Sequence, residues 1–541
     1  MVAERIRVTL LSCALALGAG CASNDAAPSS AAGTAPHVGG SAGASSAGPG
    51  VELGIPGSAG SAALPPEKEL DQSFRAPVAT GKMLWSANPV SGRVALIDAK
   101  TLAVRMTNAG FRPTYLAAVP SKAGTDSAIV LNTGSHDASW LVATATAIRV
   151  TTIATHVGAN AWSISESGRY AIAWTDAAHL EGGAPDAVNG YSELTVIDLS
   201  AEPPTSTRMS VGFRPSQVVF DAAEAHAFAV VDEGVSVLDL GDSPALAALL
   251  SVSSNGPSAH ARDVNIAADG SFAVVRADGS ADVEIIDLAS DARRVVTLES
   301  SVTDLDLSGD SKRATAILGN ATPPKVVSFA VPDPSIVATP FETAAINGEL
   351  VRSVSLAPDG KLALLYANAV PSAHLTLLDT GPGAHHYQFR TVDLQGAVQS
   401  VFVSPDSGTA ITFQSPPSGS QSRGLFSIVP TAVVRAPRIV GTDALPSEIA
   451  FSDAALGKAL VTVHDATSTA RGVYVIGLAN LEQNFVPLSS EPLPGATGIV
   501  PGAKRGFVAQ KHPEGRITFI DLDTGTAQTL SGFEIAARVV Q

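Results

Sequence analysis

Cysteine is nearly absent from this chain of 541 residues, and its two copies, Cys13 and Cys21, both lie close to the N-terminus. The body of the chain therefore has no disulfide framework and no cysteine-based metal or haem site. Aromatic residues make up 5% of the sequence and charged residues 16%, whereas hydrophobic residues make up 45%. Positive charge is also scarce, because 34 Lys and Arg face 50 Asp and Glu, for a formal net charge of −16. Such a surface repels phosphate backbones, so we expect no nucleic-acid partner.

The N-terminal segment has the pattern of an export signal. Arg5 and Arg7 precede an apolar run at 8–20, VTLLSCALALGAG. A positively charged start followed by a short apolar run is typical of a signal peptide, and this run is too short to span a membrane as a stable helix. We therefore expect the chain to be exported.

The end of this run, LGAGC at 17–21, resembles a bacterial lipobox, whose cysteine receives a lipid and becomes the new N-terminus. The resemblance implies that residues 1–21 are a lipoprotein signal peptide and that Cys21 is the lipid anchor. Gly18 departs from the leucine usual at its place, and ordinary cleavage near Ala22, which would remove Cys21, stays open. Ala22 also resembles the outer-membrane sorting signal of enteric bacteria. We expect anchoring to the bacterial outer membrane, on its periplasmic face or at the cell surface.

Residues 22–75 consist mainly of Ala, Gly, Ser and Pro and carry few charges. Such a segment buries too little apolar surface to offset the entropy lost on ordering. We expect a flexible tether with a root-mean-square reach of roughly 40 Å. The composition changes after it, and we assign residues 76–541 to one folded domain.

From residue 81 the chain repeats one pattern, seen most clearly at 261–299 and 351–380. Each copy has a short apolar strand, an Asp-Gly turn, a second apolar strand, a looser loop and a third strand that ends in Asp. Asp-Gly suits a tight hairpin, because glycine tolerates positive φ. Copies recur roughly every 47 residues, which predicts an all-β fold, a β-propeller of four-stranded blades.

An aspartate ends the third strand in six copies. A short carboxylate at that place can accept hydrogen bonds from backbone N–H groups of the turn that follows. We therefore interpret these aspartates as structural. They are Asp98, Asp198, Asp239, Asp287, Asp379 and Asp521.

Three segments carry a family resemblance: FRPSQVVF at 213–220, LAPDG at 356–360 and FVSPDS at 402–407. They resemble the YVTN-type and related WD-like repeats of bacterial propellers, in which a Pro-led inner strand and an SPDG turn precede a strand ending in Asp. The resemblance covers about residues 81–541. It implies the fold but says little about function, because propellers host many activities.

The number of repeats follows from the positions at which inner strands start. Ten such positions occur, which exceeds the usual four to eight blades. The last repeat, at Glu534, consists of an inner strand alone, whereas residues 82–107 form three strands without an inner one. We expect the C-terminal strand to pair with this N-terminal partial blade and close the ring, although two smaller propellers stay open. The start positions are Arg112, Asn160, Arg214, Arg262, Thr303, Arg352, Gln399, Leu445, Gly495 and Glu534.

One face of the predicted ring carries the longer loops. In an antiparallel meander, the loops between strands 2 and 3 lie on the same face as the starts of the inner strands. We call this the loop face. Insertions gathered on one side of a repeat protein are typical of a binding surface. The long loops are at 132–139, 176–190, 415–423 and 464–471.

Four of the ten start positions on the loop face are arginine, which is unexpected in so acidic a chain. Arginine presents a planar fork to carboxylates and phosphates, so these side chains are candidates for an anion or ligand site. The alternative, that each arginine pairs with an acid on a neighbouring blade, also stays open. The candidates are Arg112, Arg214, Arg262 and Arg352.

Histidine offers weaker candidates for chemistry. His136, His179 and His464 lie in the long loops, each near an aspartate, and the pair His385–His386 follows a Gly-Pro-Gly turn. None has the spacing of a metal site, and no catalytic Ser/His/Asp pattern or haem-attachment motif occurs. We therefore predict no metal ligand, no cofactor and no catalytic residue.

These observations favour a non-enzymatic binding or scaffold module of the cell envelope that works through its loop face. Its partner would be a protein, a peptide or an anionic glycan, and its membrane contact would be the N-terminal lipid alone. The alternative is a propeller enzyme of lactonase or hydrolase type, with its site at the mouth of the central channel. Such an enzyme needs clustered acids or histidines there, whereas the start positions offer four arginines and one acid, Glu534.

Overall fold

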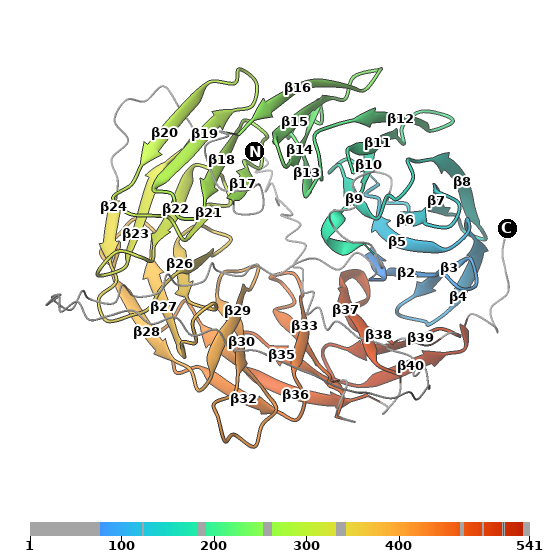
Figure 1. Cartoon of the computed structure of the whole chain (residues 1–541). Helices are drawn as coiled ribbons and strands as arrows, with labels where there is room; N and C mark the ends of the chain where they lie inside the picture. Colours follow the sequence, from blue (N-terminus) through green and yellow to red (C-terminus); the bar gives the residue numbers. More distant parts are fainter. Residues whose placement is uncertain are drawn as a thin grey trace, which may run out of the picture.

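The computed structural model shows ten four-stranded antiparallel sheets arranged in a ring, so the chain is a ten-bladed β-propeller (Figure 1). Both the predicted fold class and the predicted number of blades are confirmed. The structure describes residues 76–533 except 122–123, 181–190, 253–261, 332–341, 466–469, 489–491, 511 and 513.

Each blade is a simple meander, with its strands in sequence order from the channel outward. Blade 1 is β1 (Val78–Thr80), β2 (Met83–Asn88), β3 (Arg93–Asp98) and β4 (Val104–Asn108). Blade 2 is β5 (Pro113–Ala118), β6 (Ser127–Asn132), β7 (Asp137–Ala143) and β8 (Ile148–Ala154). Blade 3 is β9 (Ala161–Ile164), β10 (Tyr170–Trp174), β11 (Glu193–Asp198) and β12 (Thr205–Ser210), with the short 3₁₀ helix η1 (Ala177–His179) after β10. Blade 4 is β13 (Gln217–Phe220), β14 (His226–Val231), β15 (Gly234–Asp239) and β16 (Ala245–Ser251). Blade 5 is β17 (Arg262–Ile266), β18 (Phe272–Ala277), β19 (Asp282–Asp287) and β20 (Arg293–Thr297).

The second half of the ring continues the same order. Blade 6 is β21 (Asp304–Leu307), β22 (Arg313–Leu318), β23 (Lys325–Ala330) and β24 (Glu342–Ala345). Blade 7 is β25 (Ser353–Leu356), β26 (Leu362–Tyr366), β27 (His374–Asp379) and β28 (Phe389–Asp393). Blade 8 is β29 (Ala397–Val403), β30 (Thr409–Ser415), β31 (Gly424–Pro430) and β32 (Arg438–Thr442). Blade 9 is β33 (Pro446–Phe451), β34 (Lys458–Val463), β35 (Gly472–Gly477) and β36 (Glu482–Pro487). Blade 10 is β37 (Pro494–Val500), β38 (Arg505–Gln510), β39 (Arg516–Asp521) and β40 (Ala527–Ser531), with η3 (Pro501–Ala503) after β37.

The core of the molecule lies in layers between neighbouring blades. Because both faces of a blade are covered, its two middle strands are continuous apolar runs rather than alternating ones, and all six residues of β6 are buried. In one such layer Ile129 and Leu131 of blade 2 pack with Ala171 and Ile197 of blade 3. The outermost strands face solvent on one side, so exposed residues dominate β16.

The six aspartates predicted to be structural have that role. At each of these strand ends the Oδ1 atom accepts a hydrogen bond from the backbone N–H two residues later. In blade 1, for example, Asp98 accepts from the N–H groups of Lys100 and Thr101, both at 2.9 Å. The other five strand ends repeat this geometry. The carboxylate therefore fixes the turn to the outermost strand.

One part of the predicted ring closure is wrong. Residues 82–107 do not lack an inner strand, because β1 fills that place and pairs with β2 in the register Val78↔Trp85. The turn between the two strands is tight, with Gly81 at a φ of 56° that favours glycine. The C-terminal inner strand expected at Glu534 lies outside the described residues. The inner strand of blade 1 therefore comes from the N-terminal side of the chain.

Among the described residues, blade 10 and blade 1 pack against each other where the ring closes. The Gly502 N–H donates to the Gly81 carbonyl oxygen at 3.0 Å. Phe533 is buried in the same layer, together with Leu84 of blade 1 and Phe519 of blade 10. The C-terminal segment thus contributes an apolar side chain to the closing seam.

Carboxylates join neighbouring inner strands elsewhere in the ring, and two of them are Asp306 and Glu448. Asp306 of blade 6 accepts from the Leu356 N–H of blade 7 at 3.0 Å, and Glu448 of blade 9 accepts from the Thr497 N–H of blade 10 at 2.6 Å. Burial raises the pKa of Asp306 to about 6 and the pKa of Glu448 to about 7, against the opposing effect of these hydrogen bonds. These contacts tie the blades together around the channel.

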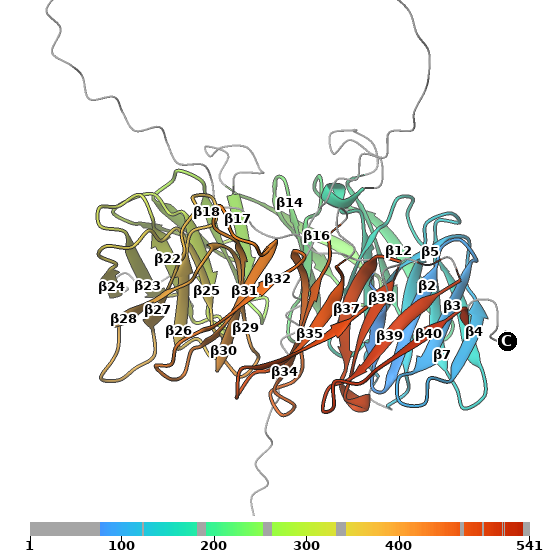
Figure 2. The same cartoon turned by 90° about the horizontal axis from the view of Figure 1, so that it is seen from below.

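The two faces of the ring differ in the turns that they carry (Figure 2). Seen edge-on, the teal 3₁₀ turn η1, which belongs to a strand 2–3 loop, lies on the upper face. The red turn η3, which joins strands 1 and 2 of blade 10, lies on the lower face. The upper face in this view is therefore the loop face. Within the described residues, no helix is both long and apolar enough to cross a membrane.

Candidate functional site

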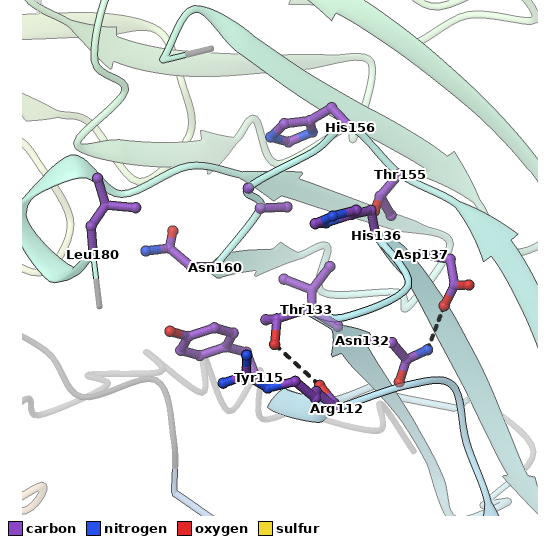
Figure 3. A pocket seen from close by; sticks show the side chains of 13 residues that line it. Arg112, Tyr115, Asn132, Thr133, His136, Asp137, Thr155, His156, Asn160 and Leu180 are labelled. Atoms are coloured by element: carbon purple, nitrogen blue, oxygen red, sulfur yellow. Dashed lines mark hydrogen bonds between the residues drawn. The ribbon is translucent and has the colours of Figure 1, made fainter. Parts of the chain in front are cut away.

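A small pocket opens on the loop face between blades 2 and 3 (Figure 3). Its volume is about 150 Å³. Blade 2 contributes Arg112, Asn132 and His136, and blade 3 contributes Asn160 and Leu180. The pocket thus combines one predicted arginine, one loop histidine and the start position of the neighbouring blade.

Arg112 reaches the pocket from the motif Gly-Phe-Arg-Pro, which precedes β5. Its backbone has a φ of 56°, in the left-handed region that few residues other than glycine adopt. The Thr133 N–H holds this turn by donating to the Arg112 carbonyl oxygen at 2.9 Å. Gly110 is required here, because a Cβ atom at that position would lie 2.4 Å from Nδ2 of Asn132. The side chain of Arg112 is exposed.

The loop between β6 and β7 forms the next part of the wall. The His136 N–H donates to the Asn132 carbonyl oxygen at 2.9 Å, which closes the loop. The Asn132 side chain, 1% exposed, donates from Nδ2 to Asp137 Oδ1 at 2.6 Å and to Ser139 Oγ at 2.9 Å. Its Oδ1 atom is buried and accepts no hydrogen bond from any residue that the structure describes.

Blade 3 closes the other side through Asn160. The Asn160 Oδ1 atom accepts from the Asp176 N–H at 2.6 Å, and its Nδ2 atom donates to the Asp176 carbonyl oxygen at 2.9 Å. Asp176 also caps η1, accepting from the Ala178 N–H, and contacts Nδ1 of His179 at 2.6 Å. This side of the pocket is therefore held rigidly by its own hydrogen bonds.

His156 lies in the pocket wall, 0% exposed, in the connection between the two blades. Its Nδ1 atom lies 3.0 Å from the hydroxyl of Thr195, and its Nε2 atom lies 3.1 Å from the hydroxyl of Thr175. Burial lowers the pKa of His156 to about 4, with a further contribution from the positive charge of Arg208. The imidazole is therefore neutral near pH 7 and joins the wall as a hydrogen-bonding group.

The structure spreads the four predicted arginines around the ring. Arg112 lines the pocket, whereas Arg214 of blade 4 pairs with Asp232 of its own blade at 2.6 Å. Arg352, at the start of blade 7, is 4% exposed and donates to Oδ1 of Asn320 at 2.8 Å. Arg262 belongs to blade 5, and its side chain lies outside the described residues. The described arginines thus belong to separate blades and do not meet in one site.

The histidine candidates also lie in different parts of the ring. His136 lies in the pocket and His179 next to its blade 3 wall, whereas His464 contacts the Ser447 hydroxyl at 2.8 Å in blade 9. The described residues contain no group of three His, Cys, Asp or Glu side chains that could hold a metal ion. The lipid-anchor candidate Cys21 lies outside the described residues.

Sequence reasoning missed two groups in the pocket wall, Asn132 and His156. The sequence contains only a weak indication that these two residues belong to a pocket. Asn132 is the polar residue that ends an otherwise apolar strand, SAIVLN, directly before a Thr-Gly turn. The partner of His156 is Thr195, 39 positions away in the chain, so only the folded structure brings them together.

Comparison with known proteins assigns the chain to no family. No family model matches the sequence, and no curated protein matches it. Among solved structures, the chain is similar to a eukaryotic initiation factor, with 10% identity, a TM-score of 0.48 and coverage of 77% of this chain and 95% of that one. It is similar to the dihydro-heme d1 dehydrogenase NirN in complex with DHE, with 11% identity, a TM-score of 0.42 and coverage of 78% and 76%. A third is apo AztD from Citrobacter koseri, with 15% identity, a TM-score of 0.40 and coverage of 66% and 94%.

Proposed function

We propose that this protein is an exported lipoprotein, anchored to the outer membrane through Cys21, whose propeller is a binding module for a protein or peptide of the cell envelope. The observation that carries the proposal is the pocket between blades 2 and 3. There an exposed arginine, Arg112, meets the long loop at 132–137 on the loop face. The export pattern at 1–21 and the tether at 22–75 support the location.

The character of the pocket favours binding over bond-making chemistry. Asn160 and His156 are occupied by hydrogen bonds to the protein, and burial keeps His156 neutral. Such a wall is preorganised, which lowers the entropy cost of binding. Arg112 supplies the charged donor. Arg214 has no part in this site, since Asp232 engages it inside blade 4.

The anchoring part of the proposal is tested by replacing Cys21→Ala and separating membrane from soluble envelope fractions. We expect the variant to move to the soluble fraction and to lose the mass of the lipid. Cys13→Ala is the matched control, because Cys13 lies inside the apolar run of the signal, and it should stay in the membrane fraction. Unchanged membrane association of Cys21→Ala would contradict lipid anchoring.

The binding part is tested by capture of envelope components on the purified protein. We expect Arg112→Gln to lose components that the wild type retains, and Arg214→Gln to retain them. If the two variants and the wild type capture the same set, the loop-face pocket is not the binding site.

A further inference from the structure

We propose that the turn between β31 and β32 of blade 8, at 431–437, inserts its tip into a lipid surface that carries anionic headgroups. This inference goes beyond the proposed function, because it adds a second membrane contact to the single N-terminal lipid expected from the sequence. It is carried by an exposed apolar pair at the tip, by arginines beside that pair, and by the lack of acids in this part of an acidic chain.

The tip of the turn is apolar and open to solvent. Val433 is 59% exposed and Val434 is 89% exposed, and no other two consecutive large hydrophobic residues are exposed in the part of the chain that the structure describes. Ala432 and Ala436 on either side are exposed as well. Turns favour Gly, Pro, Asn, Asp and Ser, so two exposed valines at such a place indicate an apolar contact outside the chain.

The turn is also built differently from those of the other blades. In six blades the third strand ends in Asp, whose carboxylate fixes the turn. Blade 8 ends this strand with Pro430, and blade 7 holds the turn instead. Nη2 of Arg390 donates to the Pro430 carbonyl oxygen at 2.9 Å. It also lies 3.4 Å from the carbonyl oxygen of Thr431 and 3.3 Å from that of Val433. Arg390 thus holds the valines in an exposed position.

Arginines lie beside the apolar tip, and acids are absent from the same segments. Arg435 and Arg438 are exposed, and neither has an ion pair with a residue that the structure describes. Burial lowers the pKa of Arg390, and no described carboxylate opposes this effect. The segments 380–392 and 424–442 together contain three arginines, two histidines and no acid, in a chain with 50 Asp and Glu. This corner of the ring is therefore locally positive.

The turn lies on the face of the ring opposite the loop face. Turns between strands 3 and 4 lie on the same side as η3, the lower side in Figure 2. The turn is at the outer rim, because β32 is the outermost strand of blade 8 (Figure 1). Asp406 of the same blade lies between the two inner strands, closer to the channel, and accepts from the Gly408 N–H at 3.0 Å. A membrane that meets this rim leaves the loop face accessible to a partner.

A lipid surface matches this combination of features. A convex apolar tip can enter a soft apolar phase, and the strength of such insertion grows with the apolar area that is buried. The exposed arginines keep their guanidinium groups at the level of the headgroups and attract anionic phosphates, with a gain of roughly fivefold for each arginine. Two valines and two exposed arginines give a weak contact, which suits a chain held near the membrane by an anchor.

Vesicle binding of the purified full chain tests the inference. The chain carries Cys21→Ala, so that no attached lipid contributes. The vesicles contain phosphatidylcholine alone or phosphatidylcholine with an equal part of phosphatidylglycerol, at a salt concentration that screens the acids of the distant faces. We expect co-sedimentation with the anionic vesicles and at least about tenfold weaker binding to the neutral ones. Arg435→Gln combined with Arg438→Gln should remove most of this difference.

Val90 provides the matched control. It is 88% exposed and lies between β2 and β3, so it belongs to the loop face. Val434→Asp should weaken binding to the anionic vesicles by at least about tenfold. Val90→Asp makes the same chemical change on the opposite face and should leave binding within about twofold of the starting chain. Thermal unfolding checks that both variants are folded.

A fluorescent label measures insertion directly. The chain has two native cysteines, so in a chain with Cys13→Ala and Cys21→Ala either Val434→Cys or Val90→Cys supplies the only thiol. The label is nitrobenzoxadiazole, whose emission responds to an apolar environment. We expect the anionic vesicles to shift the emission of the label at position 434 to shorter wavelength and to leave that of the label at position 90 unchanged.

Three results would overturn the inference. They are equal binding by the two Asp variants, an unchanged emission of the label at position 434, and no binding of the starting chain to the anionic vesicles. If the vesicles do not bind and Val434→Asp loses captured envelope proteins, the tip contacts a protein and the lipid assignment fails. Fractionation of the single Cys21→Ala variant and capture by Arg112→Gln do not depend on this tip, so the proposed function is judged separately.

Discussion

The motif Gly-Phe-Arg-Pro occurs twice, at 110–113 before blade 2 and at 212–215 before blade 4. The arginines of the two copies have different surroundings. Their backbones are alike, with a φ of 56° at Arg112 and 50° at Arg214. The unusual backbone is therefore a property of the motif and not a sign of function in either blade.

The surroundings of the two arginines differ at a matched position of the second strand's end. Tyr115 pairs with Leu131 in blade 2, and Gln217 pairs with Val230 in blade 4. Two residues beyond these partners stand Thr133 in blade 2 and Asp232 in blade 4. Asp232 pairs with Arg214 inside the blade, whereas Thr133 offers a neutral hydroxyl and Arg112 lines a pocket. The matched position thus supplies a carboxylate to Arg214 in blade 4 and a neutral hydroxyl in blade 2.

The largest expected effect concerns the buried histidine on the blade 2 side. Its folded pKa of about 4 lies below the ordinary value of 6.5, so the unfolded chain binds the proton more readily. His156 therefore contributes stability that is complete above pH 6.5 and is lost as the pH falls toward 4. Between pH 6.5 and 5 the loss is about 2 kcal/mol.

Urea unfolding at the two pH values measures this loss. His156→Gln should show a smaller decrease in the free energy of unfolding than the wild type, because glutamine can bond both threonines without titrating. Equal decreases in the two proteins would show that His156 does not carry the pH dependence.

The next effect comes from removing the counterion of blade 4. Asp232→Asn should lower the free energy of unfolding by about 1–2 kcal/mol, because it leaves the half-buried guanidinium of Arg214 without its charge partner. Thr133→Val, at the matching place in blade 2, should cost less than about 1 kcal/mol. A larger loss in Thr133→Val than in Asp232→Asn would reverse the comparison.

A smaller effect, measured as binding, is expected when Thr133 of blade 2 is replaced by the acid found at the matching place in blade 4. Thr133→Asp places a carboxylate near Arg112, where it competes with an anionic partner for the guanidinium. We expect the variant to capture less of the envelope components that the wild type retains, and equal capture would mean that Arg112 does not hold the partner.

The smallest effects concern the phenylalanines of the two motifs. Phe213 stacks with Arg214 at 5.0 Å and lies 6.3 Å from the ring of Tyr191, so Phe213→Ala should cost about 1 kcal/mol. Phe111 is mostly exposed, and Phe111→Ala should cost less than about 0.5 kcal/mol. Thermal unfolding distinguishes the two, and a greater cost at Phe111 would place that ring in the fold and not at the rim of a site.

Most of the fold could be predicted because the repeat is periodic. The Asp that ends each third strand, as in Asp98, and the Asp-Gly turns mark the blades along the chain. The mode of closure could not be predicted. The inner strand β1 has only three residues, Val78–Thr80, none fully buried, and it directly follows the Ala-rich tether, so composition does not distinguish it.

The site was predictable only in part. Arg112 and His136 are visible in the sequence, because one starts an inner strand and the other lies in a long loop. The contributions of Asn132 and His156 depend on which strands become neighbours in the ring. For the same reason the sequence could not separate Arg112 from Arg214, since the decisive residues, Thr133 and Asp232, follow about twenty positions later across a hairpin.

The measurement that tests the account most directly is the capture of envelope components on the wild type, Arg112→Gln and Arg214→Gln. We predict that Arg112→Gln retains at least about tenfold less of the components that the wild type captures, whereas Arg214→Gln stays within about twofold of the wild type. Equal losses in the two variants, or no loss in either, would contradict the claim that the arginine of blade 2 alone is directed to a ligand.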